Sequence, residues 1–486
     1  MQANYCSEKF YRSLRKGDAM KPLATLLSLV LATACSTLSS QSSLTPNLAR
    51  GLRPAAGANP IQYVVVIVQE NRSFDNLFYG FPNADTATFG FGHGVKFPLQ
   101  KLPLKWTHDI NHYHWQFLED YDSGKNDGWD GQISGFKTGP GCAHPQNHPA
   151  CWDFWQGVVY QKMPFSYVQK SDIQPYWTMA QQYALADHNF ASTNGPSFGA
   201  HQILVAGQDG HASENPSSVP WGCDRPGESE YYLQYGQASP PVFPPAVGHE
   251  VLGGDPCFDY ASIADLLDAA GVSWRWYVQK YPESDSRLSA FDAIKAVRYG
   301  PDWQNVVSPD TQVLSDIANG QLPHVSWVMP YAGASDHAGG GSGNGGPAWV
   351  ASIVNAIGQS PYWNHTAIII IWDEWGGWFD HVLPQQYADP VTGAYEGLGY
   401  RTPTIIVSPY AKVGYVSKQQ HENASSLHFI ETTFGLPSLG LADARADAYA
   451  DMFNFSQQPA KFKVIPAKND PRHFRTHSAT QPEDDY

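Results

Sequence analysis

Residues 367–381 constrain the fold more than any other stretch of the sequence; they read Ala-Ile-Ile-Ile-Ile-Trp-Asp-Glu-Trp-Gly-Gly-Trp-Phe-Asp-His. The apolar run from Ile368 to Trp372 is too short for a helix and rich in β-branched residues, which predicts a strand buried on both faces. Asp373 and Glu374 follow it directly. In an open α/β sheet, ligands bind beyond the carboxyl ends of the strands. These acids therefore form a candidate site, although an acidic turn that solubilises the strand end explains them equally well in isolation.

A second apolar run, residues 63–68, ends in the same way. It leads into Gln-Glu-Asn-Arg-Ser-Phe-Asp, which puts Glu70 and Asn71 directly after a buried strand. Carboxylate and amide oxygens are the ligands that hard divalent cations prefer. Two buried strands that both end in such groups predict two sides of one metal site, and two solvated turns explain the pair less well.

Strand-like and helix-like stretches alternate along residues 61–465, which predicts an α/β domain with a mostly parallel central sheet flanked by helices. The 43 glycines and 37 prolines predict long loop insertions. Further strands are expected at 271–278, 325–329 and 403–408, and helices at 74–80, 106–121, 175–186, 262–270, 349–358 and 425–434. Residues 81–105 are predicted to be loop, and residues 466–486 to form a loosely ordered polar tail.

The amino terminus has the layout of a signal peptide. Basic residues precede a mostly apolar run, residues 23–34, which is too short to span a membrane. Residues 32–35, Ala-Thr-Ala-Cys, resemble a bacterial lipobox with Ala in place of the usual Leu. Residues 1–34 are therefore expected to be a cleaved leader, with Cys35 as a candidate lipid anchor and an ordinary cleaved signal peptide as the alternative. Residues 35–60 would form a flexible linker.

This layout predicts export to the periplasm or anchoring in the outer membrane, with secretion as an alternative. Met20 is an alternative start to Met1. A net charge of −15 argues against nucleic-acid binding and against docking on anionic lipid by charge alone. The lipid anchor is thus the expected membrane contact, and the sequence does not indicate an oligomeric state.

Cysteine usage agrees with export. Beyond Cys6 and Cys35, the chain contains four cysteines, and sequence proximity favours the disulfides Cys142–Cys151 and Cys223–Cys257. A zinc site is the rival for the first pair, because His144 and His148 lie between its cysteines. The absence of a Cys-x-x-Cys spacing argues against zinc.

Three further polar residues complete the pattern: Ser197, within Asn-Gly-Pro-Ser-Phe, and the histidines His112 and His337. A hydroxyl beside a divalent cation can lose its proton and attack phosphorus, and nearby histidines can hold phosphoryl oxygens or protonate the leaving group. Taken singly, Ser197 is typical of a turn and His112 of a packed core. The combination indicates phosphoester hydrolysis through a phospho-serine, and the roles depend on all these residues coming together.

Several motifs resemble those of the bacterial phosphoesterase family, which includes phospholipases C and acid phosphatases and has an alkaline-phosphatase-like fold. They are Glu-Asn-Arg-Ser-Phe-Asp at 70–75, Asp-Ile-Asn-His at 109–112, the stretch 257–267, Ser-Asp-His at 335–337, Asp-Glu-Trp-Gly-Gly-Trp-Phe-Asp-His-Val at 373–382, and the stretch 430–436. The resemblance extends from about Ile61 to Phe455.

The resemblance implies a metal site and a nucleophile. The four residues that would hold one divalent ion are Glu70, Asn71, Asp373 and Glu374. Their oxygen ligands favour Ca²⁺, Mg²⁺ or Mn²⁺. Asn71 would also contact phosphate, Ser197 would be the nucleophile, and His112 and His337 would bind or protonate the phosphoryl group. His381 would contact the phosphoester substrate.

One histidine of some acid phosphatases in this family has no clear counterpart here. His324 is a weak candidate for it, which leaves the acid for the leaving group open. His108 could replace His112, since both belong to the same short segment.

The residues around the nucleophile bear on the substrate. Phospholipase C members of the family have Gly-Pro-Thr-x-Pro-Asn, whereas residues 195–202 here are Gly-Pro-Ser-Phe-Gly-Ala-His-Gln. Serine resembles the acid phosphatase branch more closely, so we expect an acid-phosphatase-like phosphoester hydrolase. A phospholipase C acting on phosphodiesters of phospholipid head groups is the alternative, and a non-catalytic exported binding protein is a weaker one.

Overall fold

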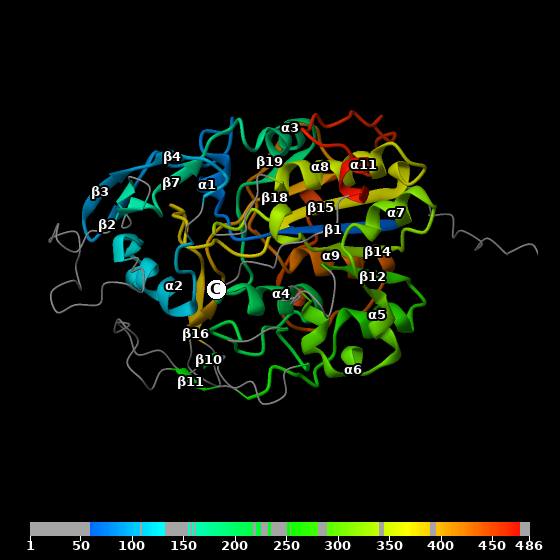
Figure 1. Cartoon of the computed structure of the whole chain (residues 1–486), viewed down its shortest axis with the longest axis horizontal. Coiled ribbons are helices and arrows are strands. Elements are labelled where there is room, and N and C mark those ends of the chain that lie inside the picture. Colours follow the sequence, from blue (N-terminus) through cyan, green and yellow to red (C-terminus); the bar gives the residue numbers. More distant parts are fainter. Residues whose placement is uncertain are drawn as a thin grey trace, which may run out of the picture. The chain divides into compact units, whose positions relative to one another are not determined.

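An eight-stranded mixed sheet forms the centre of the fold (Figure 1). In spatial order its strands are β13 (Val306–Val307), β12 (Trp274–Tyr277), β14 (Val325–Val328), β1 (Tyr63–Gln69), β15 (Thr366–Trp372), β18 (Thr404–Val407), β8 (Ala184–Ala186) and β19 (Tyr415–Ser417). Of these strands, β18 alone runs against the others. The expected α/β class with a mostly parallel sheet is therefore confirmed.

The computed structural model describes residues 59–106, 109–131, 154–155, 158–159, 162–216, 220–224, 232–234, 250–252, 254–279, 289–339, 345–388 and 395–476. The predicted leader and most of the linker, residues 1–58, lie outside these ranges. So do His108 and the proposed pair Cys142–Cys151 with His144 and His148. No helix among the described residues is long and apolar enough to span a membrane.

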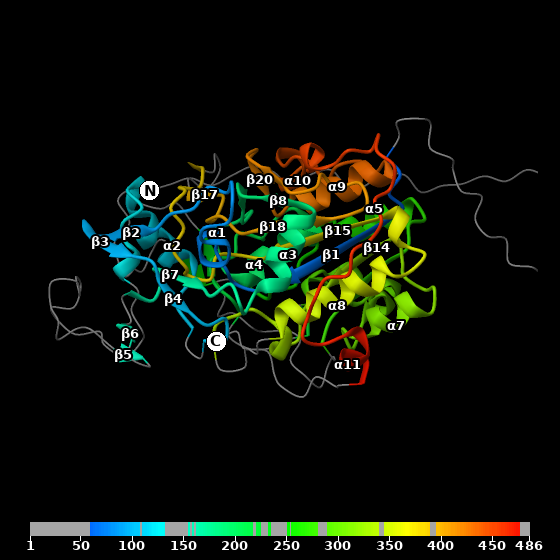
Figure 2. The ribbon, with the colours of Figure 1, turned by 90° about the horizontal axis from the view of Figure 1, so that it is seen from above.

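Helices cover both faces of the sheet (Figures 1 and 2). On one face lie α3 (Gln174–Gln182), α7 (Gln312–Ala318), α8 (Gly346–Gly358) and α11 (Pro471–Thr476), and α8 contacts the other three. The other face carries α4 (Ser197–Ala206), α5 (Ile263–Ala269) and α9 (Ser425–Phe434). Three shorter helices are α1 (Phe74–Phe78), α6 (Lys295–Arg298) and α10 (Ala442–Arg445), and Figure 1 shows α2 (His114–Tyr121) near the two-stranded ribbons.

Short two-stranded ribbons account for most of the remaining regular structure. They pair β2 (Phe89–Gly92) with β3 (Val95–Pro98), β4 (Gln100–Leu102) with β7 (Ser166–Val168), β5 (Phe154–Trp155) with β6 (Val158–Val159), β9 (Asn189–Phe190) with β20 (His421–Glu422), β10 (Tyr232–Gln234) with β11 (Glu250–Leu252), and β16 (Gln386–Ala388) with β17 (Tyr395–Gly397).

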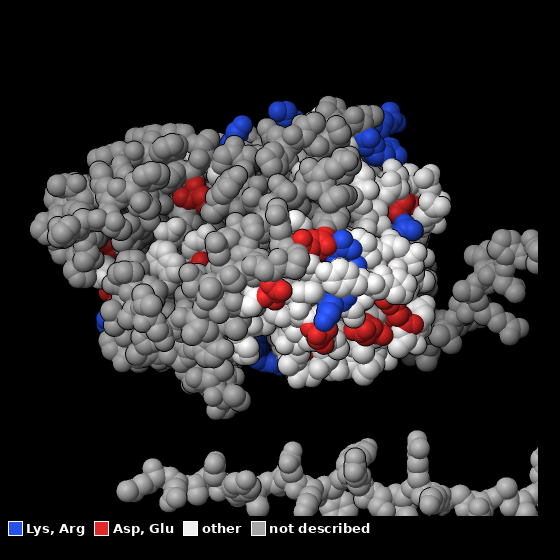
Figure 3. Space-filling model, turned by 60° about the horizontal axis from the view of Figure 1, so that its bottom comes forward, with Lys and Arg blue, Asp and Glu red and all other residues white. Residues whose placement is uncertain are grey.

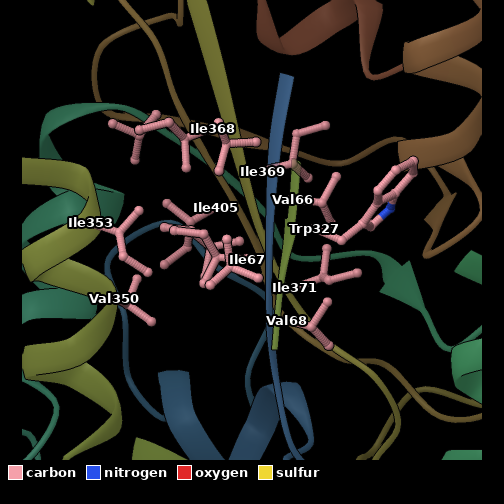
Figure 4. Packing of buried hydrophobic residues seen from close by; sticks show 14 of the residues in the cluster. Val66, Ile67, Val68, Trp327, Val350, Ile353, Ile368, Ile369, Ile371 and Ile405 are labelled. Carbon is pink, nitrogen blue, oxygen red and sulfur yellow. The ribbon is translucent and has the colours of Figure 1, made fainter. Parts of the chain in front are cut away.

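The central strands are apolar on both faces because helices bury both. Successive side chains of a strand point to opposite faces. Figure 4 shows Ile67, Ile368 and Ile405 on the side of Val350 and Ile353 of α8. The side chains on the opposite side of the sheet are Val66, Val68, Ile369, Ile371 and Trp327. This burial explains why neither apolar run alternates with polar residues.

Some predicted elements differ from the observed ones. Residues 81–105, predicted to be loop, contain β2, β3 and β4. The helix predicted from 106 begins only at His114, since Asp109 Oδ1 accepts a hydrogen bond from the next backbone N–H, which favours a turn. The helix predicted at 175–186 ends at Gln182, and residues 184–186 form β8 instead. Pairing of β8 with β18 and β19 outweighs the local helical pattern.

The carboxyl-terminal segment is also more ordered than predicted. Residues 471–476 form α11, and Phe474 is buried against Trp349 of α8, with the ring centroids 5.3 Å apart. One buried aromatic side chain thus fixes a segment whose composition is otherwise that of a polar tail.

The Cys223–Cys257 disulfide is present, as predicted, and closes a loop with a sequence separation of 34. Because a crosslink restricts mainly the unfolded chain, replacing both cysteines with serine is expected to lower the free energy of unfolding by about 3–4 kcal/mol. Denaturant titration measures this loss. Wild-type protein treated with a reductant should show at least this loss, because the reductant would also break the predicted Cys142–Cys151 bond, and an unchanged midpoint in the variant would contradict the prediction.

Charges of both signs intermingle on the surface. Figure 3 shows Lys and Arg lying close to Asp and Glu on the described part of one face. Ion pairs such as Arg298–Asp224 and Lys295–Asp259, at 2.7 and 3.3 Å, join opposite charges. On this part of the surface, neighbouring opposite charges therefore partly neutralise one another.

Candidate active site and metal centre

The candidate site begins where β1 and β15 end side by side. The two strands are parallel neighbours, and their last residues in register are Gln69 and Trp372. Glu70 and Asp373 follow this pair directly, so the register itself brings the two carboxylates to one place. Both side chains are buried. The strand ends separated by 303 positions in the sequence thus form one acidic edge of the sheet.

A tight turn holds Asn71 against this edge. Its backbone is left-handed, with φ 53°, and its N–H donates to Asp373 Oδ1 at 2.9 Å. Gly376 has φ 64°, and a Cβ there would lie 2.3 Å from the carbonyl oxygen of Asn71. Only glycine permits this approach. Gly376 therefore allows the segment that follows β15 to pack against the turn at Asn71.

Ser197 reaches the site from a third segment, as the first residue of α4. Its Oγ is 3.5 Å from Asn71 Oδ1, and its side chain is fully buried. Figures 1 and 2 show α4 beside the left-hand end of β1. The first turn of a helix favours negative charge because its backbone N–H groups lack partners within the helix. A serine at this position is well placed to carry an anionic group.

His112 contacts the amide of Asn71 on its other side. Its Nε2 is 3.1 Å from Asn71 Nδ2, and its Nδ1 is 2.7 Å from the carbonyl oxygen of Ile110. This pattern assigns the proton to Nδ1, so that Nε2 accepts from the amide and Asn71 Oδ1 is left to face Ser197. Asn71 therefore links the histidine to the serine.

His337 and Glu374 lie close to His112. The rings of the two histidines are 5.7 Å apart, and one donor atom from each lies within 4.8 Å of a carboxylate oxygen of Asp109. Glu374 Oε1 is 3.8 Å from His112 Nε2, while its Oε2 accepts from the N–H of Gly376 at 2.7 Å. Glu374, predicted as a metal ligand, thus turns toward the histidines.

A histidine that the sequence analysis did not select completes the acidic edge. His201 lies one helical turn after Ser197 on α4, and its Nε2 is 3.3 Å from both Glu70 Oε1 and Asp373 Oδ2. Burial alone lowers the pKa of His201, but the charge of Glu70 and the contact with Asp373 outweigh it and raise the pKa to about 10. The i, i+4 spacing on one helix face was the available signal.

These donors suit a divalent cation. The ligand atoms of Glu70, Asp373 and His201 all lie within 4.8 Å of one another, and all three residues are buried. Asp373 Oδ2 accepts no hydrogen bond from any described residue, so this buried charge has His201 as its close counter-charge. Buried carboxylates that converge without enough hydrogen bonds are stabilised by a cation.

His381, predicted to contact substrate, belongs to a separate group. Its Nδ1 is 2.6 Å from Asp75 Oδ2, and its Nε2 is 3.1 Å from Asp85 Oδ1. Burial lowers the pKa of His381, but the hydrogen bond and charge of Asp75 raise it overall to about 9. Arg401 pairs with Asp380 in the same group at 2.8 Å. The described contacts of Asp380 and His381 thus join the second half of the motif to α1.

His324 lies away from this site as well. Its ring stacks on Tyr63, with centroids 5.4 Å apart, and its Nδ1 is 2.8 Å from Ser273 Oγ. Tyr63 is the first residue of β1, and His324 immediately precedes β14. Both therefore lie at the amino-terminal ends of these strands, whereas Glu70 follows the carboxyl end of β1. His324 is therefore poorly placed to serve as the leaving-group acid.

Buried polar contacts hold the motifs in position. Arg72 Nε donates to the carbonyl oxygen of Asp336 at 2.7 Å, and Tyr176 and Trp372 donate to Asp336 Oδ2 at 2.8 and 3.0 Å. Burial raises the pKa of Asp336 to about 6 in spite of these hydrogen bonds. The segment that carries His337 is thereby tied to the end of β15.

Comparison with known proteins identifies the family of the chain. Residues 61–437 match the Phosphoesterase family, so the chain belongs to that family. Among curated proteins, it is 26% identical to a non-hemolytic phospholipase C of Burkholderia pseudomallei over 84% of this chain and 61% of that protein. It is 24% identical to phospholipase C A of Mycobacterium tuberculosis over 84% of this chain and 81% of that protein. The chain thus spans about three fifths of the length of the Burkholderia protein.

Solved structures give a looser likeness. A protein in the alkaline phosphatase superfamily from Vibrio parahaemolyticus aligns with 83% of this chain and 75% of its own, with 12% identity and a TM-score of 0.34. This likeness is too distant to bear on function.

Proposed function

We propose that the chain is a phosphoester hydrolase that uses Ser197 as its nucleophile beside a divalent cation. The observation that carries the proposal is the meeting of a buried serine, a buried acidic edge and His112 around Asn71, with the ring of His337 5.7 Å from that of His112. Glu70, Asp373 and His201 would hold the ion, with Asn71 and Glu374 nearby. A bound cation would supply positive charge that favours the serine alkoxide and offsets the charge of the phosphoryl group.

Ser197 Oγ passes its proton to one of the two histidines, His112 or His337, and forms a bond to phosphorus as the bond to the ester oxygen breaks. The same histidine then gives this proton to the departing oxygen. Water then hydrolyses the phospho-serine: its oxygen bonds to phosphorus as the bond from phosphorus to Oγ breaks, and one of its protons passes to Oγ. The amide of Asn71 orients the nucleophile through its oxygen and His112 through its nitrogen.

Two substrate classes, phosphomonoesters and phosphodiesters, fit the proposed chemistry, and a different observation favours each. Serine at position 197 favours monoesters, as in acid phosphatases, and we take this as the leading substrate class. The similarity to phospholipases C favours phosphodiesters of phospholipid head groups. Export, through a signal peptide and with Cys35 as a candidate lipid anchor, is compatible with both.

Turnover of p-nitrophenyl phosphate is expected to exceed that of p-nitrophenylphosphorylcholine by at least about tenfold, a modest discrimination for a pocket that fits one of two substrates. Both activities should disappear after treatment with a chelator and return with added divalent cation. Faster turnover of the choline ester would assign the chain to phosphodiesters. If the metal-supplied protein hydrolyses neither ester, the proposed function fails in favour of a binding protein.

A further inference from the structure

We propose that His201 is a ligand of the bound ion through Nε2, and that this nitrogen makes the site prefer Mn²⁺, Fe²⁺, Co²⁺ or Zn²⁺ over Ca²⁺ and Mg²⁺. This inference rests on the proposed metal-assisted function. It changes the expectation drawn from oxygen ligands alone, which put Ca²⁺ and Mg²⁺ level with Mn²⁺.

The spacing of the donor atoms supports ligation. His201 Nε2 is 3.3 Å from Glu70 Oε1 and 3.3 Å from Asp373 Oδ2. Ligand atoms bound at about 2.0–2.2 Å from a transition metal lie roughly 3 Å apart, close to these separations. Neither contact has the geometry of a hydrogen bond, and neither ring nitrogen of His201 has a hydrogen-bond partner among the described residues. The imidazole therefore stands at ligand spacing and is not locked into a hydrogen bond, and a cation that binds Nε2 displaces the proton that His201 otherwise carries.

Three other groups of histidines and carboxylates provide a comparison. In the group of Asp75, Asp380 and His381, the guanidinium of Arg401 already supplies the positive charge, at 2.8 Å from Asp380. The group of Asp109, His112 and His337 contains one carboxylate, and both of its histidines bind backbone carbonyl oxygens through Nδ1. The first group already has a cationic partner in Arg401, and the second has a single carboxylate, so neither matches the arrangement around His201.

The group of His421, Asp447 and Asp451 is the most similar in composition. However, His421 Nδ1 lies 2.7 Å from Asp447 Oδ1, and its Nε2 lies 2.9 Å from Ser417 Oγ, so hydrogen bonds occupy both ring nitrogens. His421 is as buried as His201, each with 1% of its surface exposed. His421 is therefore a matched control: a buried histidine between two carboxylates that is predicted not to bind metal.

The chemical consequence follows from ligand type. Ca²⁺ and Mg²⁺ bind oxygen almost exclusively, whereas imidazole suits the later divalent transition metals. A site of two carboxylates and one imidazole should thus discriminate between the two classes. Because α4 carries both Ser197 and His201, ligation by His201 would also fix the helix, and hence the nucleophile, relative to the ion.

The first experiment detects the nitrogen directly, without turnover. Metal-stripped wild-type protein is loaded with one equivalent of Mn²⁺ and studied by pulsed electron paramagnetic resonance. A histidine ¹⁴N coupling is expected, and it should change to the ¹⁵N pattern in protein labelled with ¹⁵N-histidine. The absence of any histidine coupling in the wild type would overturn the proposal, whatever the variants do.

The second experiment locates the nitrogen and measures the preference. Calorimetric titration of the metal-stripped wild type should give tighter binding of Mn²⁺ than of Ca²⁺. His201→Gln should lose the ¹⁴N coupling and bind Mn²⁺ at least about 10-fold more weakly, with a much smaller change for Ca²⁺. His421→Gln should retain both properties. Unchanged Mn²⁺ affinity and coupling in His201→Gln would exclude the assignment, as would loss of the coupling in His421→Gln.

These outcomes separate the inference from the proposed function. If Mn²⁺ binds without a histidine nitrogen, the role of His201 fails while metal-assisted hydrolysis stands. If the wild type binds no divalent cation at all, the metal-dependent mechanism and this inference fail together, and the hydrolysis assay decides whether a phosphoesterase activity remains.

Discussion

Ser197→Ala is expected to reduce the turnover of phosphoester substrates by at least about 10³-fold, because removal of a covalent nucleophile leaves only binding and electrostatic stabilisation. The serine hydroxyl is buried, and its 3.5 Å separation from Asn71 Oδ1 makes this a weak hydrogen bond whose loss costs little stability. The variant should therefore keep the wild-type melting temperature and its affinity for divalent cation. Steady-state kinetics at matched metal loading measures the effect.

Ser352→Ala is the matched control for this variant. Ser352 is also a fully buried serine, but it lies on α8 and donates to the carbonyl oxygen of Trp349. We expect turnover by this variant to stay within about twofold of wild type, with a stability loss of about 1 kcal/mol for the hydrogen bond. If Ser197→Ala retained more than a tenth of the activity, another group would have to be the nucleophile.

Arg401→Met is expected to cause the largest loss of stability, about 3–5 kcal/mol. The guanidinium is fully buried, pairs with both carboxylate oxygens of Asp380 at 2.8 and 3.2 Å, and donates to the carbonyl oxygens of Asp85 and Asp187. Methionine fills much of the volume but removes the directly paired counter-charge of Asp380, which leaves His381 to balance both Asp75 and Asp380. Denaturant unfolding measures the loss.

The loss should depend on pH. Burial raises the pKa of Asp380, and the charge of Arg401 opposes this rise. Without Arg401, the native carboxyl binds its proton more tightly than the unfolded one does, so the variant becomes less stable as pH rises above the unfolded pKa. The deficit relative to wild type should therefore be larger at pH 8 than at pH 5.

Lys295→Met provides the comparison for Arg401→Met. Lys295 pairs with Asp259 at the surface, where the two side chains are 52% and 79% exposed. Its replacement should change stability by less than about 1 kcal/mol at either pH. Equal losses in the two variants would show that burial does not strengthen the role of the Arg401 pair.

The strands of the central sheet could be predicted closely because their signal is local. The runs at 63–68 and 368–372 needed no partner to be recognised as buried strands, and both became β1 and β15. By contrast, residues 184–186 continue the helical pattern of the preceding segment but form β8. Their conformation is decided by pairing with β18 and β19, which come more than 200 positions later.

The residues of the candidate site likewise divide into those that local sequence predicted and those that only the fold brought into place. Glu70, Asn71, Ser197, His112, His337 and Asp373 were all selected from residue type and position next to predicted elements, and they lie together. His381 belongs to the same motif as Asp373 but lies in a separate group, where it contacts Asp75 and Asp85. His201 is absent from the sequence-based site because the helix that carries it, α4, was not predicted, and only the folded chain places it between two carboxylates.

The sequence by itself determined which chemical groups this protein brings to the carboxyl edge of its sheet, since strand burial and the acids that follow are local properties of the chain. Tertiary structure alone decided which groups meet. The register of β1 against β15 aligns Glu70 with Asp373, and the packing of α4 adds His201, so contacts between distant segments define the ligand set. Such contacts depend on the relative positions of whole elements, which no short stretch of sequence encodes.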